Sequence, residues 1–329
     1  MAPNIDPYDR KITYLRISIT DRCNLRCVYC MPVQDFRPLH HEDLLSYEEI
    51  SKLIEIATDL GVTKIRLTGG EPLLRREFVN LVETVCRTPK VEDVSITTNG
   101  VFLNDMAAPL FEAGLRRINV SLDTLDPSKY AKITGLACFD AVWKGIERAE
   151  ALGFSPIKVN VVAIRGLNDE EFEGFADLSR QKPYHIRFIE YMPIGQDNTW
   201  TPWKYIASDE IRSRLEALGP LYKVARSIHD GPAERYQFKS AKGEIGFISA
   251  ISHHFCPSCN RLRLTSDGKL RPCLFADDEV DIKSPLRNGC SDEGLKRIFL
   301  RAIAKKPQRH HAQIQKEGES LRAMSMIGG

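Results

Sequence analysis

The stretch that decides the fold runs from residue 14 to residue 30 and reads YLRISITDRCNLRCVYC. Its first part is rich in strand-forming residues and predicts a strand over residues 14–19. Three cysteines, Cys23, Cys27 and Cys30, follow at once with C-x3-C-x2-C spacing. In barrels of parallel strands, the loops after the strand ends carry the active site. We therefore expect a site in this loop.

Similar strand-forming runs alternate with amphipathic stretches along the first two thirds of the chain. The expected strands cover residues 14–19, 64–67, 94–98, 117–122, 157–163 and 186–191, and the expected helices cover 47–60, 77–86, 104–113, 140–152 and 170–180. Ser46 and Glu49 form a capping box ahead of the first helix. Repeated strand–helix units imply a parallel sheet, and six of them favour an α/β fold with a partial (β/α)6 TIM-like barrel.

The pattern changes after about residue 209, and we expect a barrel of residues 1–225 followed by a smaller α+β region of residues 226–329. This region should contain strands at 234–239 and 243–250, a hairpin of strands 261–265 and 269–272, and a helix at 293–305. The chain ends in Gly328-Gly329, which composition alone would predict to be frayed.

Composition narrows the class of protein. The chain has 329 residues, 43% of them hydrophobic, and a formal net charge of +2, which gives no reason to expect nucleic acid or an acidic membrane surface as a partner. No apolar run approaches membrane-spanning length, and the first residues do not resemble a secretion signal, so we expect a cytoplasmic protein with no membrane partner. Nine cysteines, an odd number, argue against a disulfide framework. Two groups of three suggest two metal sites.

The first group of cysteines favours an iron–sulfur cluster. Three thiolates can hold three irons of a [4Fe–4S] cluster and leave the fourth iron open. A structural zinc site normally needs a fourth ligand, and no histidine lies nearby in the sequence.

A second motif, Thr68-Gly69-Gly70-Glu71-Pro72, follows the second expected strand. Together with C-x3-C-x2-C, it resembles the radical S-adenosylmethionine superfamily. The resemblance implies that a [4Fe–4S] cluster on Cys23, Cys27 and Cys30 reduces S-adenosylmethionine to a 5′-deoxyadenosyl radical. It also implies that the Gly-Gly-Glu-Pro segment contacts the methionyl amino group and that Tyr29 lies near the adenine.

The second group comprises Cys256, Cys259 and Cys273. Zinc is a real alternative here, with His253 or His254 as fourth ligand. However, Arg261 and Arg263 follow Cys259 two residues apart, and on a strand this spacing places both side chains on one face. Such a face suits an anion better than a purely structural site.

Cations also occur within the expected barrel strands, where burial is costly unless the charge is paired. Any one of them could reach solvent or pair with a carboxylate such as Glu190. Five together, with Arg261 and Arg263, favour an anionic ligand in the barrel lumen, and a polyphosphate fits that much charge. The five are Arg16, Lys64, Arg66, Lys158 and Arg187.

These features together resemble the GTP 3′,8-cyclase family over essentially the whole chain. The resemblance implies a lyase that converts GTP to (8S)-3′,8-cyclo-7,8-dihydroguanosine 5′-triphosphate in the first step of molybdenum cofactor biosynthesis. It implies a second [4Fe–4S] cluster on Cys256, Cys259 and Cys273, whose open iron takes the guanine base. A low-potential flavodoxin or ferredoxin type donor would supply electrons, and cyclic pyranopterin monophosphate synthase would take the product. We expect a monomer or homodimer.

The resemblance also assigns individual residues. The S-adenosylmethionine contacts would be Tyr29, Gly70, Ser121 and Met192. The GTP contacts would be Arg16, Arg66, Thr97, Lys158, Arg261, Leu262 and Arg263, to which the charge argument adds Lys64 and Arg187. The Gly328-Gly329 tail would reach into the active site and support catalysis. Cys86, Cys138 and Cys290 are expected to be buried or inert thiols.

Two other classes of protein stay open at this point. One is a peptide-modifying maturase that uses a second cluster only for electron transfer. The other is a non-catalytic iron–sulfur or zinc protein that binds nucleotide as a sensor. Cleavage of S-adenosylmethionine would separate them.

Overall fold

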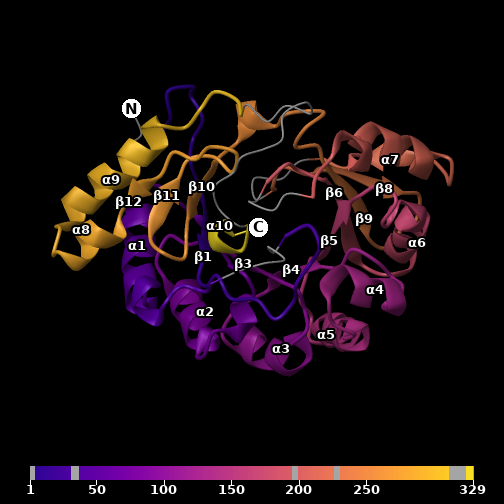
Figure 1. Cartoon of the computed structure of the whole chain (residues 1–329), viewed down its shortest axis with the longest axis horizontal. Coiled ribbons are helices and arrows are strands. Elements are labelled where there is room, and N and C mark those ends of the chain that lie inside the picture. The colour runs from indigo at the N-terminus through magenta and orange to yellow at the C-terminus, as the bar shows by residue number, and fades with distance from the viewer. Residues whose placement is uncertain (1–3, 31–36, 195–198, 226–229, 311–323, 329) are drawn as a thin grey trace.

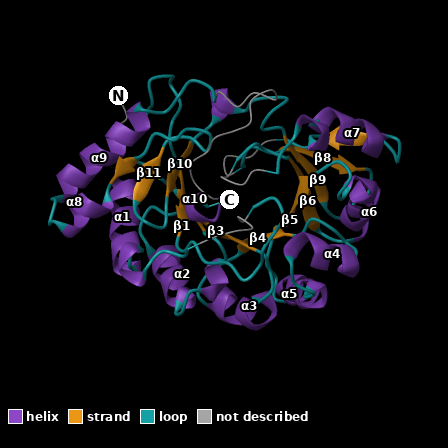
Figure 2. Cartoon of the chain, viewed as in Figure 1, coloured by secondary structure: helices purple, strands orange, loops and turns teal. Residues whose placement is uncertain are grey.

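The computed structural model describes residues 4–30, 37–194, 199–225, 230–310 and 324–328. Strands form the inner layer of an open crescent and helices form its outer layer, while the C-terminal helix lies inside the curve (Figures 1 and 2). One twelve-stranded sheet holds the strands together, in the order β12-β11-β10-β1-β2-β3-β4-β5-β6-β9-β8-β7. No helix of the described residues has the length and apolar character that crossing a membrane requires.

The six expected barrel strands are confirmed, and β1 to β6 pair in parallel in chain order. Their ends differ from the prediction by two residues or fewer. They are β1 (Tyr14–Ser18), β2 (Lys64–Thr68), β3 (Asp93–Thr98), β4 (Arg117–Ser121), β5 (Ile157–Ala163) and β6 (Tyr184–Glu190).

The five expected helices are also confirmed, with the predicted capping box of Ser46 and Glu49 at the start of the first. They are α1 (Tyr47–Asp59), α2 (Phe78–Arg87), α3 (Leu103–Glu112), α5 (Phe139–Ala151) and α6 (Phe172–Gln181). The helix α4 (Pro127–Thr134) was not predicted, although Asp126 caps its start and Gly135 ends it in the left-handed conformation.

Successive side chains along a barrel strand point to opposite faces, so that one face is apolar and the other is polar. On β1, Leu15 and Ile17 belong to the hydrophobic core, whereas Tyr14 and Arg16 line the central cavity. The outer helices cover the apolar face. The polar face is thereby left to the lumen, where a ligand can reach it.

The C-terminal strands do not form a sheet of their own, because they extend the barrel sheet on both flanks. On one flank β9 (Glu244–Ile248) pairs in parallel with β6, followed by β8 (Glu234–Phe238) and β7 (Leu221–Lys223). On the other, β10 (Arg261–Leu264) pairs in parallel with β1, followed by β11 (Lys269–Arg271) and β12 (Val280–Asp281).

The remaining helices lie around these flanks. They are α7 (Ser208–Glu216), α8 (Lys283–Arg287), α9 (Asp292–Ala304) and α10 (Met324–Ile327). The predicted strand pair, hairpin and helix are all present, so the expected smaller region is realised as two edges of one sheet. The boundary near residue 225 stays a prediction.

The direction of β10 places the two cysteine groups at opposite ends of the lumen. Cys23, Cys27 and Cys30 follow β1 and so lie beyond its carboxyl end. Cys256 and Cys259 precede β10, which is parallel to β1, and therefore lie at the amino end. Cys273 follows β11, which runs antiparallel to β10 and returns to that same end.

Glu190 ties the end of β6 to the C-terminal segment. Its carboxylate is fully buried and accepts hydrogen bonds from the backbone N–H groups of Ser208 at 2.9 Å, Ile251 at 2.7 Å and Ser252 at 3.0 Å. The Ser252 hydroxyl donates a further bond. Glu190 is thus occupied in joining segments, and among the described residues no ion pair links it to a lumen cation.

Candidate active site

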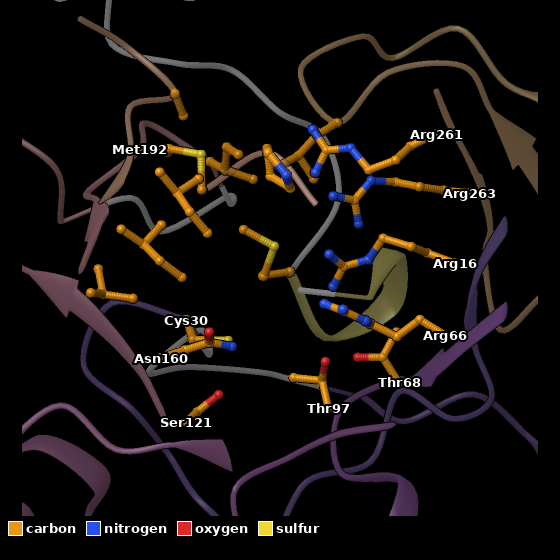
Figure 3. A pocket seen from close by; sticks show the side chains of 18 of the residues that line it. Arg16, Cys30, Arg66, Thr68, Thr97, Ser121, Asn160, Met192, Arg261 and Arg263 are labelled. Atoms are coloured by element: carbon orange, nitrogen blue, oxygen red, sulfur yellow. The ribbon is translucent and has the colours of Figure 1, made fainter. Parts of the chain in front are cut away.

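A single cavity in the lumen is lined by all six cysteines of the two groups. Arginines from β1, β2 and β10 form one wall, and Met192, Asn160 and Ser121 lie across from it or below it (Figure 3). The cavity therefore reaches from one cysteine group to the other, with the arginines between them.

Strand register produces the arginine wall. Arg16 on β1 stands beside Arg66 on β2 and beside Arg263 on β10, so three guanidinium groups form one row across neighbouring strands. Arg261 stands one step back, beside Tyr14. Figure 3 shows the four arginine side chains directed into the cavity. Three of them are at most 8% exposed, so water screens their charges poorly.

Burial and mutual repulsion destabilise the charged form of these arginines. Burial, followed by the charge of Arg66, lowers the pKa of Arg16 to about 10 and that of Arg187 to about 9. Burial and the neighbouring arginines also hold the pKa of Arg263 well below its ordinary value. A bound polyanion would reverse this effect, because opposite charge favours the protonated form.

Several polar atoms in the cavity wall also lack partners. Within the described part of the chain, Thr97 Oγ1, Asn160 Oδ1 and the Tyr14 hydroxyl are buried without a hydrogen bond. Buried polar groups are normally paired, and such an exception asks for a ligand or ordered water. Charged and neutral groups together describe a site for a polar anion.

The first cysteine loop is held by backbone bonds rather than by helix or strand. Arg26 N–H donates to the Thr134 carbonyl at 2.8 Å, and Val28 N–H donates to that of Ile133 at 3.0 Å. Burial raises the pKa of all three thiols, that of Cys30 to about 12. The thiolates that iron binding requires therefore need the positive charge of the metal itself.

The Gly-Gly-Glu-Pro segment packs directly against this loop. A Cβ on Gly70 would stand 2.2 Å from the Arg22 carbonyl oxygen, so only glycine fits here. The fully buried Glu71 carboxylate accepts bonds from Thr98 Oγ1 at 2.7 Å and from Asn99 N–H at 2.6 Å. Burial raises the Glu71 pKa to about 7. The segment thus joins the loops after β1, β2 and β3.

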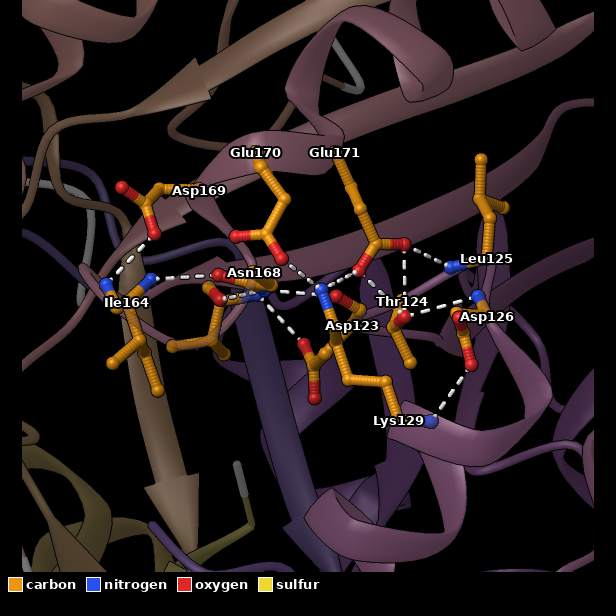
Figure 4. Close-up of polar contacts among 12 residues, drawn as sticks. Asp123, Thr124, Leu125, Asp126, Lys129, Ile164, Asn168, Asp169, Glu170 and Glu171 are labelled. Carbon is orange, nitrogen blue, oxygen red and sulfur yellow. Dashed lines mark hydrogen bonds and ion pairs between the residues drawn. The ribbon is translucent and has the colours of Figure 1, made fainter.

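Tyr29 is positioned by a buried acid, Asp123, that was not among the predicted site residues. Its hydroxyl donates to Asp123 Oδ2, while Asp123 Oδ1 accepts a bond from Val162 N–H at 2.8 Å. Burial raises the pKa of Asp123 to about 6. Asn168 in turn donates to the Asp123 carbonyl at 2.8 Å (Figure 4). The available signal was a polar residue directly after a barrel strand.

A carboxylate network fixes the loop that carries Asp123. Glu171 accepts bonds from Thr124 Oγ1 at 2.8 Å and Leu125 N–H at 2.7 Å, and it pairs with Lys129 at 2.7 Å (Figure 4). The loops after β4 and β5 are therefore locked together, which holds Tyr29 against the cavity.

The second cysteine group lies among cations. Burial alone would raise the pKa of Cys259, but Arg261 and Lys306 lower it to about 6. Lys306 is buried and donates to the carbonyls of Arg261 and Pro272, both at 2.8 Å. Arg10 donates to the Cys256 carbonyl at 2.9 Å. The charges of Arg261 and Lys306 thus stabilise the thiolate of Cys259, the form in which cysteine binds metal, whereas burial raises the pKa of Cys256.

Neither histidine proposed as a zinc ligand is directed to this group. His253 is exposed, and its Nε2 lies 2.6 Å from Asp209 Oδ2. His254 bonds through Nδ1 to the Ala250 carbonyl at 3.2 Å. Among the described residues, no three cysteine, histidine or carboxylate side chains converge closely enough for a single metal ion. Cysteines of a [4Fe–4S] cluster bind separate irons, and three of them can hold a cluster with one open iron.

The predicted site residues divide by location. Tyr29, Gly70, Ser121 and Met192 all line the cavity, as do Arg16, Arg66, Thr97, Arg187, Arg261 and Arg263. Leu262 packs in the hydrophobic core on the other face of β10. Lys64 and Lys158 are not among the residues that line the cavity, and Lys64 pairs with Asp93 at 2.7 Å. Arg263 donates to the carbonyl of Gly328, while Gly329 lies outside the described residues.

Comparison with known proteins defines the class first. A family model of the radical SAM superfamily matches residues 17–179, and a model named Molybdenum Cofactor Synthesis C matches residues 184–312. The solved structure of SuiB from Streptococcus suis is similar over 92% of this chain and 68% of that chain, with a TM-score of 0.62 and 15% sequence identity. At that identity the likeness shows the fold alone. Fold and cysteine motif together define a radical S-adenosylmethionine enzyme.

Curated relatives define the family more closely. The chain is 51% identical to GTP 3′,8-cyclase of Thermodesulfovibrio yellowstonii, over 98% of this chain and 99% of the relative. It is 48% identical to GTP 3′,8-cyclase of Desulforamulus reducens, over 99% of this chain and all of the relative. The chain belongs to the GTP 3′,8-cyclase family.

We predict that Lys158→Met flattens the pH dependence of stability. Burial, followed by the charge of Arg187, lowers the pKa of Lys158 from 10.5 to about 5. Between these values the unfolded chain binds a proton that the folded chain does not, so the free energy of unfolding rises with pH. The slope from one proton is about 1.4 kcal/mol per pH unit. Urea unfolding of the nucleotide-free protein between about pH 6 and about pH 8 measures whether the variant loses it.

The exposed Lys239→Met provides the matched control and should keep the wild-type slope. An unchanged slope in Lys158→Met would mean that Lys158 stays protonated in the folded protein.

Proposed function

We propose that this chain converts GTP to (8S)-3′,8-cyclo-7,8-dihydroguanosine 5′-triphosphate, as a lyase acting in the first step of molybdenum cofactor biosynthesis. The observation that carries the proposal is the single cavity with a cysteine group at each end and an arginine row between them. A maturase that uses its second cluster only for electron transfer has no need of that row. A sensor has no need of a site for S-adenosylmethionine.

The arginine row would hold the triphosphate. Arg16, Arg66 and Arg263 offer forked donors that match phosphate oxygens, and their spacing is fixed by backbone pairing rather than by flexible loops. Thr97 supplies an unpaired hydroxyl nearby, and Arg187 adds charge from β6. Lys64 would add positive charge near the row, and Lys158 would do so once the bound anion raises its pKa. Rigid positioning decides which ribose hydrogen faces the radical.

The carboxyl end of the strands would hold S-adenosylmethionine. Gly70, Ser121 and Met192 line this end, and Tyr29 is fixed there by Asp123. Cys23, Cys27 and Cys30 would hold a [4Fe–4S] cluster, which would supply the electron for cleaving S-adenosylmethionine to the radical that abstracts hydrogen from the GTP ribose. Closed packing of Gly70 on Arg22 helps to exclude water from this end.

Cys256, Cys259 and Cys273 would hold a further [4Fe–4S] cluster, which would supply an iron able to bind the guanine base. The nearby cations Arg261 and Lys306 favour the thiolate of Cys259, and Arg10 holds the backbone carbonyl of Cys256 in place. This arrangement favours the cluster over zinc, because zinc sites without an open position use four protein ligands.

The enzyme would depend on an electron donor and on a downstream enzyme. A low-potential flavodoxin or ferredoxin type protein would donate electrons, and cyclic pyranopterin monophosphate synthase would receive the product. We expect a cytoplasmic monomer or homodimer that divides near residue 225. Curated relatives named GTP 3′,8-cyclase support the choice of substrate.

An anaerobic assay tests the function. We expect the reconstituted protein with dithionite, S-adenosylmethionine and GTP to form 5′-deoxyadenosine together with the cyclised nucleotide, both identified by mass spectrometry. Deoxyadenosine without any change in GTP would refute the substrate. No deoxyadenosine from protein that contains iron and sulfide would refute radical chemistry.

The iron content tests the second cluster. We predict that Cys273→Ala binds about half the iron of the wild-type protein, because each cluster holds about four irons. Cys290→Ala, which changes a cysteine outside both groups, should keep the wild-type content. Elemental analysis that finds about four irons and one zinc in the wild-type protein would contradict the second cluster.

Deletion of the C-terminal tail tests whether its contact with Arg263 supports catalysis. Deletion of Gly328 and Gly329 should leave the iron content unchanged and lower the rate of product formation, because Arg263 loses the Gly328 carbonyl that it binds beside Ser18 and Thr68. The initial rate under saturating GTP measures the effect. Equal rates for the shortened and full chains would assign the tail no part in turnover.

A further inference from the structure

An exposed patch covers the outside of the first cysteine loop. Its side chains are Arg22, Arg26 and Val28 from the loop, together with Lys132 and Leu136 from the end of α4 and the turn after it. The two segments are joined by the Arg26–Thr134 and Val28–Ile133 backbone bonds. A Cβ on Gly135 would stand 3.5 Å from the Arg26 Cβ, so they are in direct contact. We call these five residues the loop patch.

The loop patch combines apolar and basic groups. Val28 is 41% exposed and Leu136 is 45% exposed, which makes them two of the nine large apolar side chains that stand out in the described structure. Two more, Leu74 and Phe102, follow segments bonded to the loop through the Glu71–Arg22 and Asn99–Asn24 contacts. Exposed apolar side chains thus occur on the cysteine loop and on segments bonded to it, and contiguous apolar exposure is typical of protein interaction sites.

The charge of the loop patch has one sign. Residues 22–28 and 131–137 contain three cations and no Asp or Glu. Arg26 is turned toward its own loop and donates to the Cys23 carbonyl at 2.7 Å. Throughout residues 22–28 and 131–137, no cation forms an ion pair within the described structure. A net charge of only +2 for the whole chain makes this local excess specific.

We propose that the loop patch docks an acidic one-electron carrier protein, which reduces the cluster held by Cys23, Cys27 and Cys30. The proposal rests on the proposed function, since each cleavage of S-adenosylmethionine consumes one electron. The carrier loses that electron and the oxidised cluster gains it, with no bond made or broken between the proteins. Val28 lies one residue from Cys27 and two from Cys30 in the sequence, so a carrier seated here is brought to the cysteine loop itself.

The physical form of the patch determines how docking should behave. Complementary charge chiefly raises the association rate and is weakened by salt. The two apolar side chains supply a small dry centre within a basic rim, the arrangement common to transient interfaces. Docking should therefore be weak, fast and salt-sensitive, as suits a carrier that must leave after each electron.

A double variant and a matched control test the proposal on the reconstituted holoenzyme. The docking variant is Lys132→Glu with Leu136→Asp. The control is Lys239→Glu with Tyr222→Asp, which makes the same charge change at exposed positions on the β7–β8 edge of the sheet. Binding of an acidic bacterial flavodoxin in its oxidised form is measured by biolayer interferometry at low and high salt. We expect the docking variant to weaken binding roughly tenfold or more and the control by less than about twofold.

Dithionite separates docking from chemistry, because this small reductant needs no protein interface. All three proteins should form 5′-deoxyadenosine equally with dithionite, while the docking variant should be slow with reduced flavodoxin. Equal flavodoxin affinity in the two variants would overturn the proposal, as would undetectable binding to the wild-type protein. Failure of the proposed function would show differently, as unaltered GTP with dithionite in the wild-type protein.

Discussion

The parallel pairing of β10 with β1 is the interaction on which the rest of the site depends. It places Arg263 beside Arg16 and carries Cys256 and Cys259 to the end of the lumen opposite Cys23. Without it, the second cysteine group would have no fixed relation to the first. Ladder bonds set this relation to within a fraction of a residue, because a slip of one position would turn Arg263 into the core and Leu262 into the cavity.

The arginine row that results is unfavourable in the empty protein. Three like charges on neighbouring strands are buried, and the pKa of Arg16 falls to about 10 in response. The surrounding core of apolar residues tolerates this cost, as it does for active sites in general. A bound polyanion converts the same repulsion into binding energy, so stability and affinity are opposed at these positions.

Much of this arrangement could be predicted from sequence, and the reasons for the exceptions are physical. Local spacing predicts the strands, the helices and both cysteine groups, because these depend on periodicities of a few residues. The location of Cys256 at the far end of the lumen depends on which strand β10 joins, and no local pattern carries that information. Asp123 and Lys306 were missed for the same reason, since their partners Tyr29 and Arg261 are distant in sequence. The ion pair of Lys64 with Asp93 on the neighbouring strand likewise depends on strand pairing, which no local pattern reveals.

The two ends of the lumen also differ in charge, and this difference favours a cationic ligand at one end and an anionic ligand at the other. The carboxyl ends of the strands hold the buried acids Glu71 and Asp123, with pKa values raised to about 7 and about 6. A sulfonium cofactor bound there brings positive charge, which favours the ionised acids. The other end holds Arg10, Arg261 and Lys306, which favour an anion. A nucleoside triphosphate at the first end would meet acids, and a sulfonium at the second would meet arginines. One continuous cavity can therefore hold both ligands in a single order.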